Sequence, residues 1–208
     1  MTNKWNYQPP TQTEIQERDH LAAGLGLSPV ISLLLVRRGL KTAKEVKKFF
    51  RPSLNDLEDP FLMPDMQKAV SRLNQALGEK EKILIYGDYD VDGTTAVSLV
   101  YKYLRAYTSN LFYYIPDRYD EGSGISIKGI DYAYNQGVTL IISLDCGIKA
   151  IDKIEYAKEK GIDFIICDHH MPDEVLPDAV AVLDAKRKDS IYPYEHLSGC
   201  GVGFKFMQ

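Results

Sequence analysis

From residue 82 onward, short apolar segments alternate with segments of helical periodicity, and this alternation constrains the fold more than any other feature. The expected strands are 83–86, 111–115, 140–144, 164–167 and 180–183, and the expected helices are 95–107, 127–135 and 150–160. Strands and helices that alternate with short links are typical of βαβ units and of a mostly parallel sheet. The strands are apolar without a break, as in a sheet that is covered on both faces. We therefore expect an α/β fold with a mostly parallel sheet flanked by helices.

The residues before this domain are expected to form a small helical appendage. Helical periodicity is found in residues 21–27, 29–36, 42–50 and 65–77. Thr42, with Glu45 three residues later, has the pattern of a capping box at a helix start. The chain is thus predicted to hold a helical leader, 1–77, and an α/β domain, 78–208.

Composition excludes several classes of protein. No segment is apolar and long enough to cross a membrane, and the start lacks the basic and apolar runs of a signal peptide, so a cytoplasmic protein is expected. The three cysteines are scattered and lack CxxC spacing, which argues against a disulfide framework and a structural zinc site. A net charge of −4 argues against a surface that is basic throughout, but it allows a local basic groove.

The last residues, 201–208, resemble a turn that enters a helix, and no stop signal follows them. We expect the domain to continue beyond this point, so that the chain is truncated at its C-terminal end.

Acidic residues and histidines stand where three of the predicted strands end. They are Asp88, Asp90 and Asp92 after the first strand, Asp145 after the third, and Asp168, His169 and His170 after the fourth. The carboxyl ends of parallel strands share one edge of a sheet, which is where open α/β folds bind ligands. We therefore expect these side chains to converge.

Clustered carboxylates need a positive counter-charge, because like charges at close range raise one another's pKa. Oxygen ligands with one or two imidazoles suit Mn²⁺ or Mg²⁺, and there are enough ligands for two ions. Two ions about 4 Å apart favour hydrolysis of a phosphate ester or anhydride. Each Asp alone is as readily explained as a helix cap or turn residue, and only the conjunction of three strand ends favours a metal site. Cys146 and Cys167 are interpreted as small apolar fillers beside it.

A second candidate site, for substrate, comprises Arg118, Gly122, Gly124 and Ser126. A glycine-rich loop before a helix offers free N–H groups to a phosphate, and Arg adds a bidentate charge. An ordinary flexible loop explains the segment equally well. The basic residues of 37–48 are interpreted as a solvated face, and Tyr103 and Tyr107 as packing residues.

Three motifs carry a resemblance to a known family. Residues 86–95, Tyr-Gly-Asp-Tyr-Asp-Val-Asp-Gly-Thr-Thr, resemble the first signature of the DHH phosphoesterase superfamily; residues 144–147, Leu-Asp-Cys-Gly, resemble its second; and residues 168–170 are the Asp-His-His that names it. Within the superfamily, segments 26–39, 59–66, 114–122 and 199–205 are similar to the RecJ family of exonucleases specific for single-stranded DNA.

The resemblance implies a metal-dependent 5′-to-3′ exonuclease that acts on single-stranded DNA in repair and recombination, with repair and replication proteins as further partners. It implies that the metal is bound directly by Asp90, Asp92, Asp145 and His169, with Asp145 bridging two ions. Asp88 is either a further ligand or lies close behind the ligands. His170 is expected to face the substrate phosphate as donor or general acid, and Asp168 to orient a histidine.

The chain departs from the family pattern at two positions. Many members have a histidine at or beside Tyr86, and RecJ-like sequences have a tyrosine where Ser123 stands. The family also has a further acidic ligand, a second domain of the DHHA1 type and an oligonucleotide-binding domain. None of these is present in this chain, so the activity of this part alone stays open. Two alternatives stay open: a DHH phosphatase for pyrophosphate or small nucleotides, and a DHH scaffold without catalysis.

Overall fold

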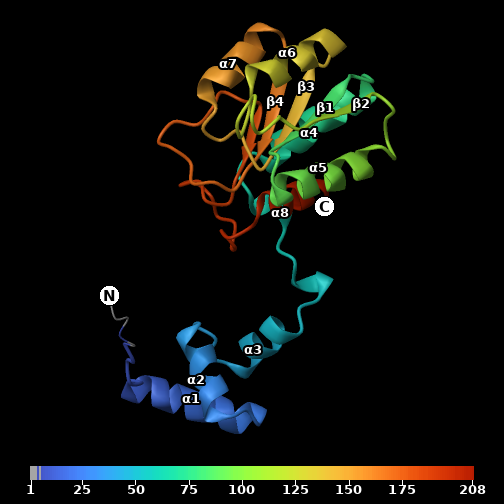
Figure 1. The fold of residues 1–208 in the computed structure, drawn as a ribbon. Helices are drawn as coiled ribbons and strands as arrows, with labels where there is room; N and C mark the ends of the chain where they lie inside the picture. Colours follow the sequence, from blue (N-terminus) through green and yellow to red (C-terminus); the bar gives the residue numbers. More distant parts are fainter. Residues whose placement is uncertain (1–3, 5) are drawn as a thin grey trace. The chain divides into compact units, whose positions relative to one another are not determined.

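The computed structural model describes residue 4 and residues 6–208 (Figure 1). Contacts divide the chain into two compact units, Met1–Leu57 and Glu58–Gln208. Within the described residues, none of the helices combines the length and the apolar character that crossing a membrane would require.

The first unit is a small helical bundle. Its elements are α1 (Gln12–Leu25), α2 (Pro29–Arg37), α3 (Ala43–Phe50) and the 3-10 turn η1 (Leu54–Asp56). Leu21, Leu35, Val36 and Val46 form its core. The helix expected at 21–27 is the end of the longer α1, whose first turns are polar and therefore show no apolar period. A capping box of Thr11 and Glu14 marks its start.

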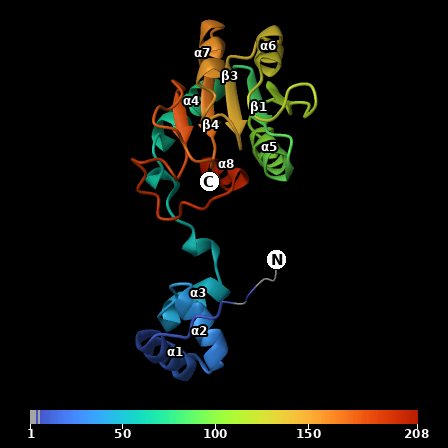
Figure 2. The ribbon, with the colours of Figure 1, turned by 60° about the vertical axis from the view of Figure 1, so that its left-hand side comes forward.

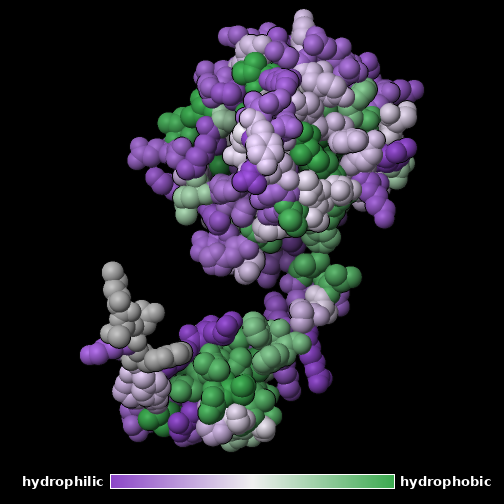
Figure 3. Space-filling view, in the orientation of Figure 1, coloured by the Kyte–Doolittle hydropathy of each residue, from purple (hydrophilic) through white to green (hydrophobic). Residues whose placement is uncertain are grey.

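This unit also exposes apolar side chains. Figure 3 shows hydrophobic residues gathered on the face of the bundle that is in view. Val30, Ile31 and Leu34 of α2 are among the exposed apolar residues.

The second unit holds a five-stranded parallel sheet in the order β2-β1-β3-β4-β5. The strands are β1 (Ile83–Gly87), β2 (Leu111–Tyr114), β3 (Leu140–Leu144), β4 (Asp163–Cys167) and β5 (Ala181–Leu183). The helical elements are η2 (Pro60–Leu62), α4 (Met66–Gly78), α5 (Val91–Leu104), α6 (Ile127–Gln136), α7 (Ile151–Glu159) and α8 (Gly199–Met207). The predicted α/β class with a parallel sheet is confirmed.

Helices cover both faces of the sheet (Figure 2). Side chains of α4, α5 and α8 pack in one apolar cluster with Ile83, Ile85, Ile142 and Ile165. Side chains of α6 and α7 pack in a second cluster on the opposite face. The uninterrupted apolar strands reflect this double cover.

Helix α4 packs against the sheet, within the second unit. The guanidinium of Arg72 donates to Glu81 at 2.8 and 2.9 Å and to Asp163 at 2.7 Å, which joins the helix to the segments that begin β1 and β4. The compact units therefore divide before α4, whereas the boundary predicted from the sequence followed it. As a boundary between functional domains, residues 77/78 stay a prediction.

The register of the sheet brings four strand ends into line. Gly87 pairs with Leu144, Leu144 with Cys167, and Cys167 with Leu183. The residue that follows each of these four is an aspartate: Asp88, Asp145, Asp168 and Asp184. The topology thus places a row of carboxyl groups along the carboxyl edge of the sheet.

Candidate metal centre

Asp145 lies at the centre of the row. It is 2 % exposed, and its backbone has φ 62°, a left-handed conformation that costs a non-glycine residue on the order of 1–3 kcal/mol. Its Oδ1 has no hydrogen-bond partner within the described residues, although His169 Nε2 lies 3.1 Å away without hydrogen-bond alignment. Burial, with the charges of Asp92 and Asp90, raises the pKa of Asp145 to about 7. A buried acceptor of this kind requires a proton or a cation.

The two histidines complete a set of donors around this carboxylate. One ligand atom each from Asp145, His169 and His170 all lie within 4.8 Å of one another. Nε2 of His169 is also 3.7 Å from Asp92 Oδ2. Carboxylate oxygen with imidazole nitrogen is a donor set that suits Mn²⁺ or Mg²⁺, so the residues present fit a divalent cation. The grouping also admits His170 as a metal donor, a role that we had not assigned to it from the sequence.

Asp168 holds the two histidines in place by hydrogen bonds. It is 1 % exposed; Oδ2 accepts from the Ile148 N–H at 3.0 Å, and Oδ1 accepts from the His169 N–H and lies 2.7 Å from His170 Nδ1. Burial alone would raise the pKa of Asp168, but the hydrogen bonds from His170 and Ile148 bring this pKa below its ordinary value. The same contact raises the pKa of His170. The arrangement leaves Nε2 of His170 as the ring nitrogen that can face a ligand.

The two aspartates after β1 that lie nearest the helix also cap helices. Asp90 is the N-cap of α5, and its Oδ1 accepts from the Gly93 N–H at 2.9 Å. Asp92 accepts from Gly199 and Cys200, both at 2.8 Å, so its oxygens hold the first turn of α8. α5 therefore begins at Val91 and not at Thr95, because Asp90 supplies the cap. A carboxylate oxygen has more than one lone pair, so capping leaves these residues able to bind metal.

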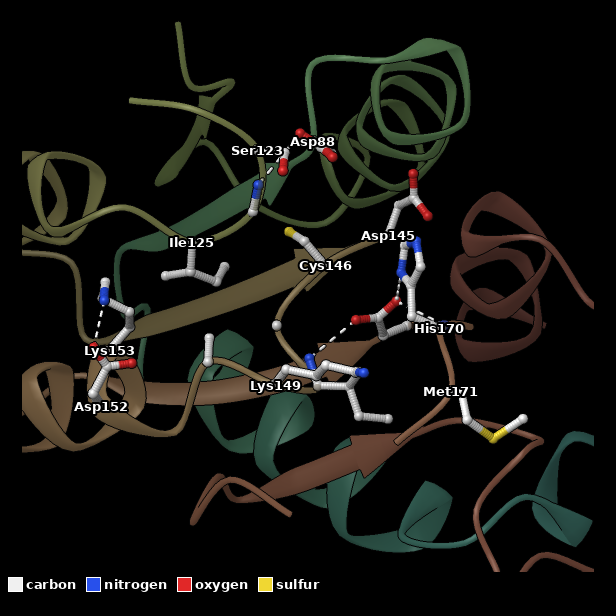
Figure 4. Close-up of a pocket in the computed structure, with 15 residues that line it drawn as sticks. Asp88, Ser123, Ile125, Asp145, Cys146, Lys149, Asp152, Lys153, His170 and Met171 are labelled. Atoms are coloured by element: carbon white, nitrogen blue, oxygen red, sulfur yellow. Dashed lines mark hydrogen bonds and ion pairs between the residues drawn. The ribbon is translucent and has the colours of Figure 1, made fainter. Parts of the chain in front are cut away.

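Asp88 lies on the side of Asp145 that is opposite His170, beside the 123–125 loop (Figure 4). Its Oδ1 accepts from the Tyr89 N–H at 2.8 Å and from the Gly124 N–H at 3.4 Å. Asp88 thus ties the first motif to the loop that was predicted to bind substrate.

Two glycines permit the close approaches at this edge. A Cβ on Gly199 would lie 2.5 Å from the Asp145 Cβ, and one on Gly93 would lie 2.4 Å from the Asp88 carbonyl oxygen. The N–H of Gly199 donates to Asp92 at 2.8 Å.

The predicted substrate loop is braced by a buried polar network. The Tyr86 hydroxyl donates to the Gly124 carbonyl at 2.9 Å and accepts from the Ser126 N–H at 3.1 Å. Glu121 accepts from the hydroxyls of Ser126 and Tyr114 at 2.5 and 2.9 Å. Ser126 also caps α6 through the Gly129 N–H at 2.9 Å. The Ser126 hydroxyl is therefore engaged inside the loop.

The arginine of this loop is exposed and stands over an aromatic ring. The Arg118 guanidinium carbon lies 5.2 Å from the centroid of the Tyr89 ring. Because Tyr89 stands between Asp88 and Asp90, this contact places Arg118 beside the first acidic motif. Gly122 and Gly124 have φ of 79° and 83°, which glycine adopts without strain.

A cavity of about 580 Å³ opens beside the centre (Figure 4). Asp88, Asp145, Asp168 and His170 line it, together with Lys149 and other residues at the start of α7. Cys146 lies in the wall of this cavity, and Cys167 lies in the apolar cluster under α4, α5 and α8. Both are buried, and burial raises the pKa of each thiol. Both cysteines act as small buried side chains, as expected from the sequence.

Two residues of this region escaped the sequence analysis. Asp184 is fully buried, its Oδ2 has no partner within the described residues, and burial raises its pKa to about 6. Lys186 donates to the backbone carbonyl of His169 at 2.5 Å. The signal for Asp184 was present, since it follows a predicted strand directly, as Asp145 and Asp168 do.

Two tyrosines of α5 and the arginine at the end of α2 lie outside the metal centre. Tyr103 and Tyr107 were interpreted as packing residues. They pack against each other, with ring centroids 5.3 Å apart, on a surface where they are 44 % and 62 % exposed. Arg37 donates to Glu14 and to the Gln8 carbonyl, and so stabilises the first unit from its surface.

A parallel α/β sheet with acidic residues and histidines at its carboxyl edge defines the class of metal-dependent phosphoesterases. A family model described as "DHH family, N-terminal domain" matches residues 82–208. The chain belongs to the DHH family, and it is a RecJ-like member of that family.

Individual relatives agree with this assignment. The chain is 39 % identical over 202 residues to the single-stranded-DNA-specific exonuclease RecJ of Bacillus subtilis, covering 97 % of this chain and 25 % of that protein. It is similar to a crystal structure of exonuclease RecJ bound to manganese, with TM-score 0.63 and 28 % identity over 70 % of this chain and 37 % of that one. Its fold matches that of RecJ in complex with Mn²⁺ from Thermus thermophilus, with TM-score 0.73 and 24 % identity over 96 % and 27 %.

The chain spans about a quarter of the length of the Bacillus subtilis relative. The activity of the whole relative is therefore only proposed for this chain, below.

Proposed function

We propose that this chain is the metal-binding part of an exonuclease that hydrolyses single-stranded DNA from its 5′ end, with Mn²⁺ or Mg²⁺ as cofactor. The observation that carries the proposal is the buried, unpartnered Oδ1 of Asp145 beside His169, in a row of strand-end aspartates. The similarity to RecJ supports the substrate and the direction. DNA repair and recombination are the processes that this activity would serve.

The chain's own residues divide the work in this proposal. Asp145, His169, Asp90, Asp92 and Asp88 would hold the cations. Bound Mn²⁺ or Mg²⁺ supplies positive charge to the reacting phosphate and lowers the pKa of a water.

His170 and Arg118 are assigned to the substrate. Asp168 fixes the ring of His170 and keeps its pKa raised, so that His170 can donate a hydrogen bond or a proton to a phosphate oxygen. Arg118, with the N–H groups of the 122–126 loop, is assigned to a neighbouring phosphate.

The experiment uses the full-length protein, Mn²⁺, and single strands labelled at the 5′ or the 3′ end. We expect mononucleotides to appear first from the 5′ end, and Asp90→Ala and Asp145→Ala to abolish hydrolysis while far-UV circular dichroism stays unchanged. Attack from the 3′ end, or equal activity on duplex DNA, would contradict the proposal.

The same site suits the two alternatives, and each has its own test. A phosphatase for small substrates would hydrolyse pyrophosphate or dinucleotides faster than long single strands. A scaffold would show no rise of melting temperature with Mn²⁺. The intact donor set around Asp145 counts against the scaffold.

A further inference from the structure

A groove lies along the open edge of the sheet, outside the metal centre. β2 pairs with β1 alone among the described strands, so its outer side is free (Figure 1). A cavity of about 510 Å³ follows this edge, and four of its seven lining residues are tyrosines: Tyr101, Tyr113, Tyr114 and Tyr132.

The tyrosines come from three elements and lie on both sides of the strand. Tyr101 of α5 meets Tyr113 edge-to-face, with ring centroids 5.6 Å apart. On the other side, Tyr114 lies 5.2 Å from Tyr132 of α6. Tyr113 is 59 % exposed, so the side of its ring is open to solvent. Open aromatic rings beside a groove are a platform on which planar groups can stack.

The charge around this groove differs from that of the chain as a whole. The chain has net charge −4, yet residues 93–116 contain no Asp or Glu and carry Lys102 and Arg105. The guanidinium carbon of Arg105 lies 5.7 Å from the centroid of the Tyr101 ring. On the other side of the strand, the Lys82 amine lies 6.0 Å from the Phe112 ring. Cations thus flank the aromatic side chains on both sides of β2.

The groove leads toward the metal centre. The chain that leaves the carboxyl end of β2 reaches Arg118 four residues later, and Arg118 stands over Tyr89 of the first acidic motif. Three acidic residues stand at this end of the strand, and each has a partner. Glu121 accepts from Tyr114 and Ser126, Asp117 accepts from the N–H groups of Tyr119 and Asp120, and Asp120 lies 3.9 Å from Lys128. Arg118 is therefore a cation that a polyanion along β2 would meet beside carboxylates that are already engaged.

From this geometry we infer that the β2 edge binds the part of a single-stranded nucleic acid that extends beyond the reacting phosphate. The inference rests on the proposed function and adds a second contact region to it. Bases stack on Tyr113 and its neighbours, and Arg105 and Lys102 face the phosphates. A peptide strand added to β2 would use the same edge, but it would not account for the lack of acidic residues in 93–116. β2 is also only 4 residues long, which gives an added strand few backbone groups to pair with.

The test measures binding and hydrolysis separately on the full-length protein. Anisotropy of a labelled oligothymidine of about 30 nucleotides, in EDTA, reports binding without cleavage. Hydrolysis of thymidine 5′-(4-nitrophenyl phosphate) with Mn²⁺ reports the metal centre alone. We compare Tyr113→Ala, Tyr113→Phe and Arg105→Ala with the control Tyr134→Ala, an exposed tyrosine of α6 that contacts Lys160 instead.

Tyr113→Ala is expected to weaken oligothymidine binding by about tenfold, Tyr113→Phe by less than about twofold, and Tyr134→Ala not at all. Arg105→Ala is expected to lower the slope of log K against log salt by about 0.7. Hydrolysis of the small ester should stay unchanged in all four. Unaltered oligothymidine affinity in both Tyr113→Ala and Arg105→Ala would overturn the inference and leave the edge to a peptide strand. Failure of the wild type to hydrolyse either substrate would count against the proposed function, while the EDTA measurement still judges the groove.

Discussion

The backbone of Gly199 lies against the side chain of Asp145, so closely that a Cβ at residue 199 would be 2.5 Å from the Asp145 Cβ. α8 thereby closes one side of the metal centre, and Asp92 holds its first turn by two hydrogen bonds.

Gly199→Ala should therefore destabilise the protein by about 1–3 kcal/mol, because neither the helix backbone nor the buried aspartate can yield without strain. Gly201→Ala is the matched control in the same helix. Its Cβ would meet only ordinary contacts at 3.4 Å or more, and alanine favours the helix by up to about 1 kcal/mol. Urea denaturation of both variants measures the difference, and equal stability would contradict the packing described.

Asp145→Asn should change stability in opposite directions with and without metal. The pKa of Asp145, raised to about 7 in the fold, means that above this pH the folded state holds a buried charge that the unfolded state hydrates. Without metal at pH 8, Asp145→Asn should raise the melting temperature. With Mn²⁺, the wild type should gain stability that the variant lacks, because the cation binds the carboxylate.

The control for this measurement is Asp178→Asn, an exposed aspartate at which neither effect is expected. A variant that gains as much stability from Mn²⁺ as the wild type would exclude Asp145 as a ligand.

Asp184 gives a second pH dependence. Its pKa is about 6 in the fold and about 4 when unfolded, so folding takes up a proton between these values and stability falls as pH rises through them. Asp184→Asn should be about as stable as the wild type at pH 4 and more stable above pH 6, by about 2–3 kcal/mol. Asp189→Asn should behave in the opposite way, since Arg187 lowers the pKa of Asp189 and stability is then lost as pH falls. Melting temperatures from about pH 2 to pH 8 check both signs, because the loss at Asp189 falls below its ordinary pKa of about 4.

Tyr86→Phe should loosen the 122–126 loop. The hydroxyl of Tyr86 donates to the Gly124 carbonyl and accepts from the Ser126 N–H. Its loss leaves two partly buried backbone groups unpaired, at a cost of about 1–3 kcal/mol. Amide hydrogen exchange in this loop should rise, and KM for the oligonucleotide should rise more than kcat falls. Tyr134→Phe, at an exposed tyrosine of α6, is the control. Unchanged exchange in Tyr86→Phe would contradict the bracing role.

The sheet and its acidic edge were predictable because both depend on local patterns. Uninterrupted apolar segments mark buried strands, and the residue after each strand is found by counting; Asp145, Asp168 and His169 lie together for this reason. Asp184 could have been found by the same rule, but its strand is short and no second acidic residue or histidine follows it.

Other features depend on contacts that sequence spacing does not encode. The commitment of Asp92 to α8 joins residues more than a hundred positions apart, and it could not be seen without the packing of α5 on α8. The role of Tyr86 depends on where the loop before α6 folds back. The start of α1 was missed although Thr11 and Glu14 have the pattern of a capping box, because apolar periodicity was taken as the main sign of a helix.

The position of α4 has a practical consequence. Arg72 fastens it to the segments that begin two strands, and Ala69, Leu73 and Ala76 fill the cluster beneath them. A recombinant truncation that started where the family match starts, at residue 82, would remove α4 and expose the apolar side chains that it covers, although α5 and α8 would still pack on the same face. Expression trials of the second unit should accordingly keep every residue from Glu58 onward.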